Sequence, residues 1–192
     1  MKKNVVLIVI LLMSLWLYCD VTVAEIKGHS FRKFINNFVE EELVLKYQED
    51  TERFYLLLKQ GKVTIEITID EEYRDKLYEI IKDFEKMKRR AVAWEETYDK
   101  EIGRLPVAES RFHKGSSWYN SKVNTEVNFF SQNLEWHQLI LFFSEMHAAE
   151  NKNVHNNQFS LYFWDDDVRN LKKVFSKRAF KNYKKKVEQG KQ

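Results

Sequence analysis

The sequence predicts an α+β domain in which helices pack on one side of an antiparallel sheet. Two segments, residues 63–69 and 159–163, alternate apolar and polar side chains, which is typical of strands with one buried face. Apolar residues at spacings of three and four follow each segment and indicate an amphipathic helix. A single shift of 94 positions aligns both the strand phase and the helix phase. We therefore expect two strand–helix halves: a β-hairpin plus helix, then a three-stranded meander plus helix.

An N-terminal helix is expected before the sheet, beginning at Ser30, whose side chain suits the cap position. Its apolar residues recur at spacings of three and four: Phe31, Phe34, Ile35, Phe38 and Val39. We interpret this stripe as core packing, in preference to a surface that docks into a partner.

Residues 54–58 and 63–69 are expected to pair as a hairpin, because Gly61 between them supplies the positive φ of a tight turn. Acidic residues 70–72 open the helix that follows, and basic residues gather at 86–90 near its end. Both placements are favourable to the helix dipole, so we expect one long amphipathic helix here.

Residues 94–122 show no clear period and contain the only proline, Pro106, so we interpret them as a long connection. Long connections in compact domains are uncommon and often carry function. The candidate partner-binding residues within it are aromatic: Trp94, Tyr98, Trp118 and Tyr119.

Residues 123–129, 136–143 and 159–163 are expected to form the antiparallel meander. A helix is expected from about Asp165, followed by a basic helical tail over about residues 176–192.

Residues 1–24 have the pattern of a secretory signal peptide. Lys2 and Lys3 precede a short apolar run, and small residues lead up to Ala24. The run is about 14 residues, shorter than the ~20 that span a bilayer. We expect cleavage after about Ala24, which leaves a single secreted or periplasmic bacterial domain of residues 25–192. The alternatives are an uncleaved membrane anchor and a lipid on Cys19, the only cysteine.

The C-terminal tail carries most of the positive charge. Residues 169–192 contain ten Lys or Arg and one Glu, a net charge of +9. The whole chain carries +3 and residues 1–24 carry +1, which leaves −7 on residues 25–168. One interpretation is a solvated helix face, and the functional one is contact with an anionic partner, including peripheral contact with a membrane. The candidate contact residues are Lys181, Lys184, Lys185 and Lys186.

The apolar stripe of the same tail places Leu171 and Phe175 in the core. Only Tyr183 and Val187 continue the stripe, so the end beyond about Lys181 is expected to be loosely held.

Three adjacent aspartates, Asp165, Asp166 and Asp167, stand where the last strand meets its helix. Acids at such a junction cap free N–H groups and meet the positive end of the helix dipole. A calcium loop needs spaced oxygen ligands and a glycine at its turn, and neither is present here. We interpret the aspartates as a helix start.

The histidine-rich segment at residues 137–155 does not have the spacing of a zinc site. His137 and His147 are about 33 Å apart on one strand, at ~3.3 Å per residue. His147, Glu150 and His155 converge only if the loop between them folds back. We therefore expect no metal ligand and no cofactor.

Catalytic motifs are also lacking. The Gly115-Ser116-Ser117 segment is typical of a turn rather than of a nucleophile elbow, and His113 nearby has no identifiable acid partner. The five glycines form no phosphate-binding loop.

The function expected from these observations is a secreted, non-catalytic binding or interaction domain, of the inhibitor or immunity type. Its partner is expected to be a protein or an anionic component of the envelope, and nucleic acid is not an expected partner in that compartment. The alternative is a hydrolase of envelope polymers with its site in residues 94–122.

Overall fold

The computed structural model describes residues 20–132 and 135–189. In chain order its elements are β1 (Asp20–Arg32), β2 (Asn37–Gln48), β3 (Arg53–Gln60), β4 (Val63–Ile69), α2 (Glu71–Trp94), β5 (Tyr98–Lys114), β6 (Ser117–Gln132), β7 (Trp136–Phe143), β8 (Met146–His147), β9 (His155–Asn156), β10 (Phe159–Phe163), α3 (Asp165–Val174) and α4 (Lys177–Gln189). Eight of these described strands form a closed antiparallel barrel in the order β1-β10-β7-β6-β5-β4-β3-β2. Strands β8 and β9 form a separate two-stranded sheet.

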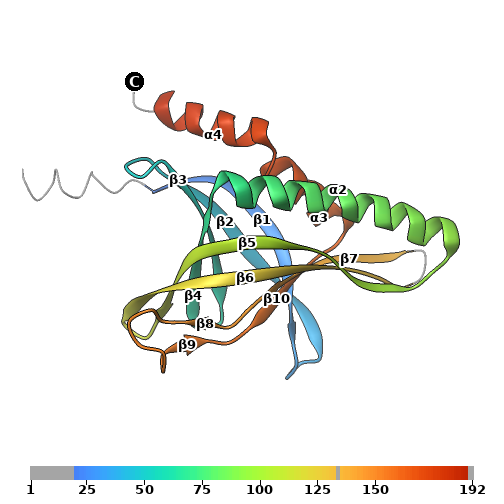
Figure 1. Ribbon diagram of the computed structural model, residues 1–192, viewed down its shortest axis with the longest axis horizontal. Coiled ribbons are helices and arrows are strands. Elements are labelled where there is room, and N and C mark those ends of the chain that lie inside the picture. Colours follow the sequence, from blue (N-terminus) through green and yellow to red (C-terminus); the bar gives the residue numbers. More distant parts are fainter. Residues whose placement is uncertain (1–19, 133–134, 190–192) are drawn as a thin grey trace, which may run out of the picture.

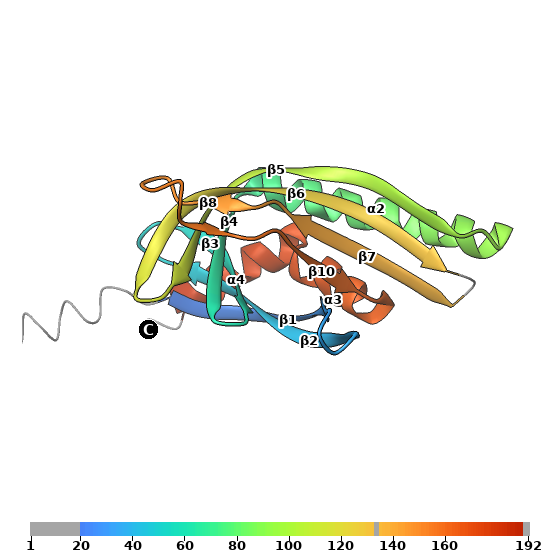
Figure 2. The same ribbon diagram turned by 90° about the horizontal axis from the view of Figure 1, so that it is seen from below.

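The closed barrel contradicts the predicted α+β sheet with two strand–helix halves. Strands β4 and β10 do each run directly into a helix, as their pattern indicates. However, the two strands lie on opposite sides of one barrel, separated by three strands in either direction. Figure 1 shows all three labelled helices gathered over one side of that barrel, and Figure 2 shows the same arrangement from below.

The predicted N-terminal helix is wrong, because residues 20–48 form the β1–β2 hairpin. Phe31 and Phe38 are cross-strand neighbours with ring centroids 5.3 Å apart. A four-residue turn, residues 33–36, joins the two strands, with Asn36 at φ 48°. The apolar residues of the turn and of the strand ends happen to recur at the spacing of three and four that is typical of a helix. Leu43, Leu45 and Tyr47 are buried while the residues between them are more exposed, which is the alternation of a strand.

The predicted long connection over residues 94–122 is also wrong, because it forms most of the β5–β6 hairpin. Gly115 at φ 68° makes the turn between the two strands. Pro106 lies at a register shift between Leu105 and Ala108, which is one of the few places where a sheet accepts proline.

Other local predictions are confirmed. Strands β3 and β4 pair around Gly61, which has φ 62°, and α2 follows them. Strands β6, β7 and β10 form the meander, and α3 begins at Asp165. Leu171 and Phe175 are buried, as the tail pattern indicates. However, α4 continues to Gln189 with Val187 only 8% exposed, so the expectation of a loosely held end is wrong.

Helix α2 packs on the barrel through one apolar face, formed by Tyr73, Leu77, Ile80, Ile81 and Phe84. This face contacts β5, β6 and β7. Gly103 of β5 permits the close approach, because a Cβ atom there would lie 2.7 Å from Ile80 Cδ1. Helix α3 contacts β1, β7, β10 and α2, so the helices and strands share one core.

The predicted signal segment lies mostly outside the described residues, including Lys2, Lys3 and Cys19. Ala24 is described, and it lies inside β1, opposite Leu45 of β2. Over residues 20–132 and 135–189, no helix is long and apolar enough to cross a membrane.

Candidate functional site

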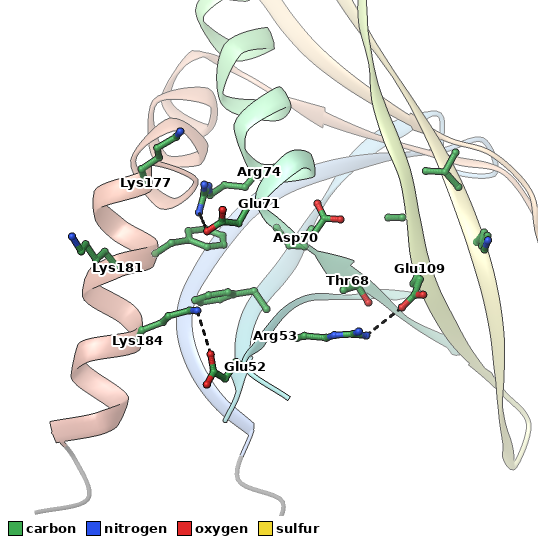
Figure 3. Close-up of a pocket in the computed structure, with 16 residues that line it drawn as sticks. Glu52, Arg53, Thr68, Asp70, Glu71, Arg74, Glu109, Lys177, Lys181 and Lys184 are labelled. Carbon is green, nitrogen blue, oxygen red and sulfur yellow. Dashed lines mark hydrogen bonds and ion pairs between the residues drawn. The ribbon is translucent and has the colours of Figure 1, made fainter. Parts of the chain in front are cut away.

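A hollow on the barrel opens where two neighbouring strands part. Pairing between β4 and β5 ends at Ile67 and Ser110. Close to this point, next to Pro106, β5 also shifts its register with its other neighbour, β6. A hollow of about 900 Å³ lies here between the start of β3, the end of β4 and the start of α2, with β5 and β6 on one side and α4 on the other (Figure 3). We call this hollow the basic cleft.

Basic residues outnumber acidic ones in the lining of the basic cleft. The basic residues are Arg53, Arg74, Lys122, Lys177, Lys181 and Lys184. The acidic residues are Glu52, Asp70, Glu71 and Glu109. The remaining lining is mostly apolar: Phe54, Thr68, Ile69, Val107, Ala108 and Phe180. The cleft therefore combines an apolar floor with a charged rim that has a positive excess.

Arg74 is the charged side chain most firmly fixed in the basic cleft. It is only 7% exposed, and its guanidinium lies 2.8 Å from Asp75 and 5.3 Å from the centroid of the Phe180 ring. Lys177 of α4 pairs with the same Asp75 at 2.9 Å. Lys177 and Arg74 together hold the pKa of the Asp75 carboxyl below its usual value. This network connects α4 to the first turns of α2.

Two further ion pairs lie at the rim of the basic cleft (Figure 3). Arg53 of β3 pairs with Glu109 of β5 at 3.3 Å, across the gap between β4 and β5. Lys184 lies 3.9 Å from Glu52. Within the described part of the chain, Lys122 and Lys181 form no ion pair, so their charges are available to a ligand.

The N-terminus of α2 also faces the basic cleft, but its cap position is already filled. The Asp70 carboxylate accepts a hydrogen bond from the Tyr73 backbone N–H at 2.7 Å. A ligand in the cleft therefore meets lysine and arginine side chains rather than a free helix end.

The structure brings together two of the eight predicted partner-binding residues, Lys181 and Lys184, in the basic cleft. Lys185 and Lys186 are exposed on α4 and do not line the cleft. Sequence reasoning missed Arg53, Arg74 and Lys122, because no local pattern distinguishes them from ordinary surface cations.

The predicted aromatic residues do not form one surface with these lysines or with each other. Trp94 is exposed at the C-terminal end of α2, and Tyr98 begins β5. The Tyr98 hydroxyl donates a hydrogen bond to Glu96, which raises the pKa of Tyr98. Trp118 and Tyr119 lie at the other end of the β5–β6 hairpin.

At that end of the hairpin both aromatic side chains have structural partners. Trp118 covers the Arg111 guanidinium at 4.8 Å, and Arg111 pairs with the buried Glu66 at 2.6 Å. Tyr119 stacks on Phe112 with ring centroids 5.5 Å apart. These contacts stabilise the turn end of the hairpin, and Trp118 remains 45% exposed.

The three aspartates are engaged separately. Asp167 accepts a hydrogen bond from the Trp164 backbone N–H at 3.1 Å, which supports the predicted role at a helix start. Asp165 pairs with Lys88 of α2, and Asp166 pairs with Arg169. Their carboxylates are therefore not directed at one point.

The apolar stripe predicted to lie in the core instead forms the tip of the β1–β2 hairpin. Phe34 is 86% exposed and Ile35 is 50% exposed. Phe38 alone packs inward, with its ring 5.2 Å from that of Trp164. The tip lies at the end of β2 opposite to the basic cleft, so it forms a separate apolar surface.

One group of possible metal ligands is present among the described residues: Glu145, His147 and His155. Strands β8 and β9 place the two histidines directly opposite each other, because the loop between them folds back. Glu150, the acid considered from the sequence, instead accepts a hydrogen bond from Asn120.

No protein-family model matches this chain, and no curated protein or solved structure matches it either. The functional conclusion therefore depends on the geometry of the molecule.

Proposed function

We propose that this protein is a secreted, non-catalytic binding domain whose basic cleft holds an anionic group of an envelope component. The observation that carries the proposal is the placement of α4. Three of its lysines, Lys177, Lys181 and Lys184, line the hollow. Arg53, Arg74 and Lys122 line the same hollow, so cations from four different elements gather at one place.

The charges in the lining favour a small anion over a long polyanion. Six basic residues against four acidic ones leave an excess of two positive charges. A phosphate group with about two negative charges would balance this excess, and a long polyanion would meet the acidic residues. We therefore favour a phosphorylated headgroup, with its apolar neighbour placed against Phe54, Val107 and Phe180.

The fixed network around Arg74 favours binding with little rearrangement. Arg74 is held by Asp75 and Phe180 before any ligand arrives, so few side chains lose freedom on binding. Lys122 and Lys181 are then the cations that gain a partner. The expected result of removing them is a loss of affinity rather than a loss of stability.

Binding to vesicles tests the proposal. Wild-type protein should bind vesicles that contain a phosphomonoester lipid more tightly than zwitterionic vesicles. The double variant Lys122→Gln/Lys181→Gln should lose most of that preference.

The matched control is Lys185→Gln/Lys186→Gln, which removes the same charge from residues outside the cleft. Equal losses in the two double variants would show that binding follows overall charge and would contradict the proposal. Soluble phosphomonoester headgroup should compete with the vesicles if the cleft is the site.

A further inference from the structure

We propose that Glu145, His147 and His155 bind one divalent transition-metal ion of the zinc class. The ligand atoms of the three side chains all lie within 4.8 Å of one another. Two imidazoles and one carboxylate form a donor set that suits zinc and its neighbours, whereas calcium and magnesium prefer oxygen ligands alone. This site does not depend on the proposed anion binding.

The distances from the Glu145 carboxylate to the two imidazoles are close to what one ion requires, although each imidazole faces a different carboxylate oxygen. His147 Nε2 lies 3.5 Å from Glu145 Oε2, and His155 Nε2 lies 3.5 Å from Glu145 Oε1. Donors bound at about 2.1 Å in a tetrahedral arrangement are about 3.4 Å apart. The carboxylate therefore stands at nearly the required separation from both imidazoles.

The second nitrogen of His147 faces a hydrogen-bond acceptor. His147 Nδ1 lies 3.4 Å from the backbone carbonyl oxygen of Lys152. A carbonyl only accepts hydrogen bonds, so this contact requires a proton on Nδ1 and leaves Nε2, which faces Glu145, as the nitrogen that would bind an ion. Histidines that bind metals usually donate their other N–H in this way.

The segment that carries the ligands is anchored before any ion binds. The Ala148 N–H donates to Val154 O at 2.9 Å, which closes the loop between the two histidines. Ser121 Oγ donates to His147 O at 2.8 Å, and Lys114 Nζ donates to His155 O at 2.8 Å. Both ligand-bearing strands are thus held by the β5–β6 hairpin, which lowers the entropy cost of assembling the site.

The group leaves coordination positions open toward solvent. The three side chains are 53% (His147), 44% (Glu145) and 41% (His155) exposed, so an ion reaches them without unfolding. Glu145 and His147 also line a hollow of about 610 Å³ together with Ser121 and Lys122. A three-ligand site beside a hollow is typical of metals that take a water or a substrate group as a further ligand.

Zinc binding to the tag-free full chain tests the assignment. Equilibrium dialysis should give one Zn²⁺ per chain, and Co²⁺ in place of Zn²⁺ should give the visible absorption of a four- or five-coordinate site. His147→Ala, His155→Ala and Glu145→Gln should each weaken Zn²⁺ binding by at least about tenfold.

The matched control is His113→Ala, because His113 lies on β5 outside the group. This variant should retain wild-type zinc affinity. Melting of each metal-free variant should match that of the wild type, because the side chains changed are partly exposed. The assignment is overturned if the wild type binds no Zn²⁺ stoichiometrically, or if all four variants bind it equally well.

Discussion

The Tyr73 hydroxyl of α2 lies 3.4 Å from Thr125 Oγ1 of β6, in the core between the helix and the barrel. Tyr73 is 2% exposed and Thr125 is 1% exposed. Burial raises the pKa of Tyr73 to about 12, so the phenol stays neutral and is able to donate a hydrogen bond. This pair connects the first turn of α2 to the barrel beside the basic cleft.

Replacing both members of this pair should destabilise the protein by less than the sum of the two single replacements. Tyr73→Phe leaves the Thr125 hydroxyl buried without its partner, and Thr125→Val leaves the phenol in the same state. Each single change should cost about 1–2 kcal/mol of unfolding free energy. The double variant should cost less than the sum of the two. Urea unfolding of the four proteins measures the coupling, and strict additivity would show that the hydroxyls do not interact.

His137 should make the protein less stable in mild acid. It is 2% exposed and stacks on Phe129, and neither ring nitrogen has a hydrogen-bond partner within the described ranges. Burial, followed by the charge of Lys88, lowers its pKa in the folded state. The unfolded chain therefore takes up the proton first, near the usual value of about 6.5. Stability is present above that pH and is lost as pH falls toward the lowered pKa.

The variant His137→Phe isolates this effect, because it retains the aromatic stack and removes the proton site. Its melting temperature should fall less than that of the wild type between about pH 7 and about pH 5. The other four histidines are present in both proteins, so their contribution cancels in the comparison. Parallel curves for the two proteins would exclude His137 as the source.

Deleting residues 182–192 should lower stability, contrary to what the tail pattern suggests. Tyr183 lies 6.0 Å from Phe180 and 6.5 Å from Phe54 between ring centroids, and Val187 is 8% exposed. Loss of their burial should cost about 2 kcal/mol. Lys185→Gln/Lys186→Gln removes charge without removing these contacts and should melt like the wild type. Unchanged melting of the deletion would show that the end of α4 is not held.

Local periodicity predicted the elements that bury one face within a short segment. Strands β4 and β10 and helix α2 have this property, because Ile65, Ile67 and Ile69 alternate while Leu77, Ile80 and Phe84 follow a helical period. The same reasoning gave a wrong prediction for the β1–β2 hairpin. Its tip exposes Phe34 and Ile35, so the spacing of apolar residues there does not report a buried face.

The β5–β6 hairpin was missed for a different reason. A strand of a barrel pairs on both sides, and its neighbours are set by long-range closure rather than by local pattern. Ala108, Ser110 and Phe112 are buried at every second position, as in a strand. Pro106 and the register shift beside it interrupt this alternation.

The candidate sites divide in the same way. Lys181 and Lys184 were predictable from the basic tail alone. Arg53, Arg74 and Lys122 join them only because the barrel closes and α4 folds back. His147 and His155 likewise lie together only because β8 pairs with β9. Strands of two residues are too short to show a period in the sequence.

The pairing between β1 and β10 closes the barrel, so it determines when the barrel is able to form. Its register pairs His29 with Tyr162, residues from opposite ends of the chain, and His29 also packs against Trp164 with rings 4.1 Å apart. Strand β1 therefore gains its second neighbour only after synthesis has passed the end of β10 at Phe163. Until then the free edge of β1 is open to pairing with another nascent copy. Contacts this distant in sequence also slow folding, so the interval of exposure is long. Cellular yield of this protein should therefore depend on how well that edge is shielded during synthesis.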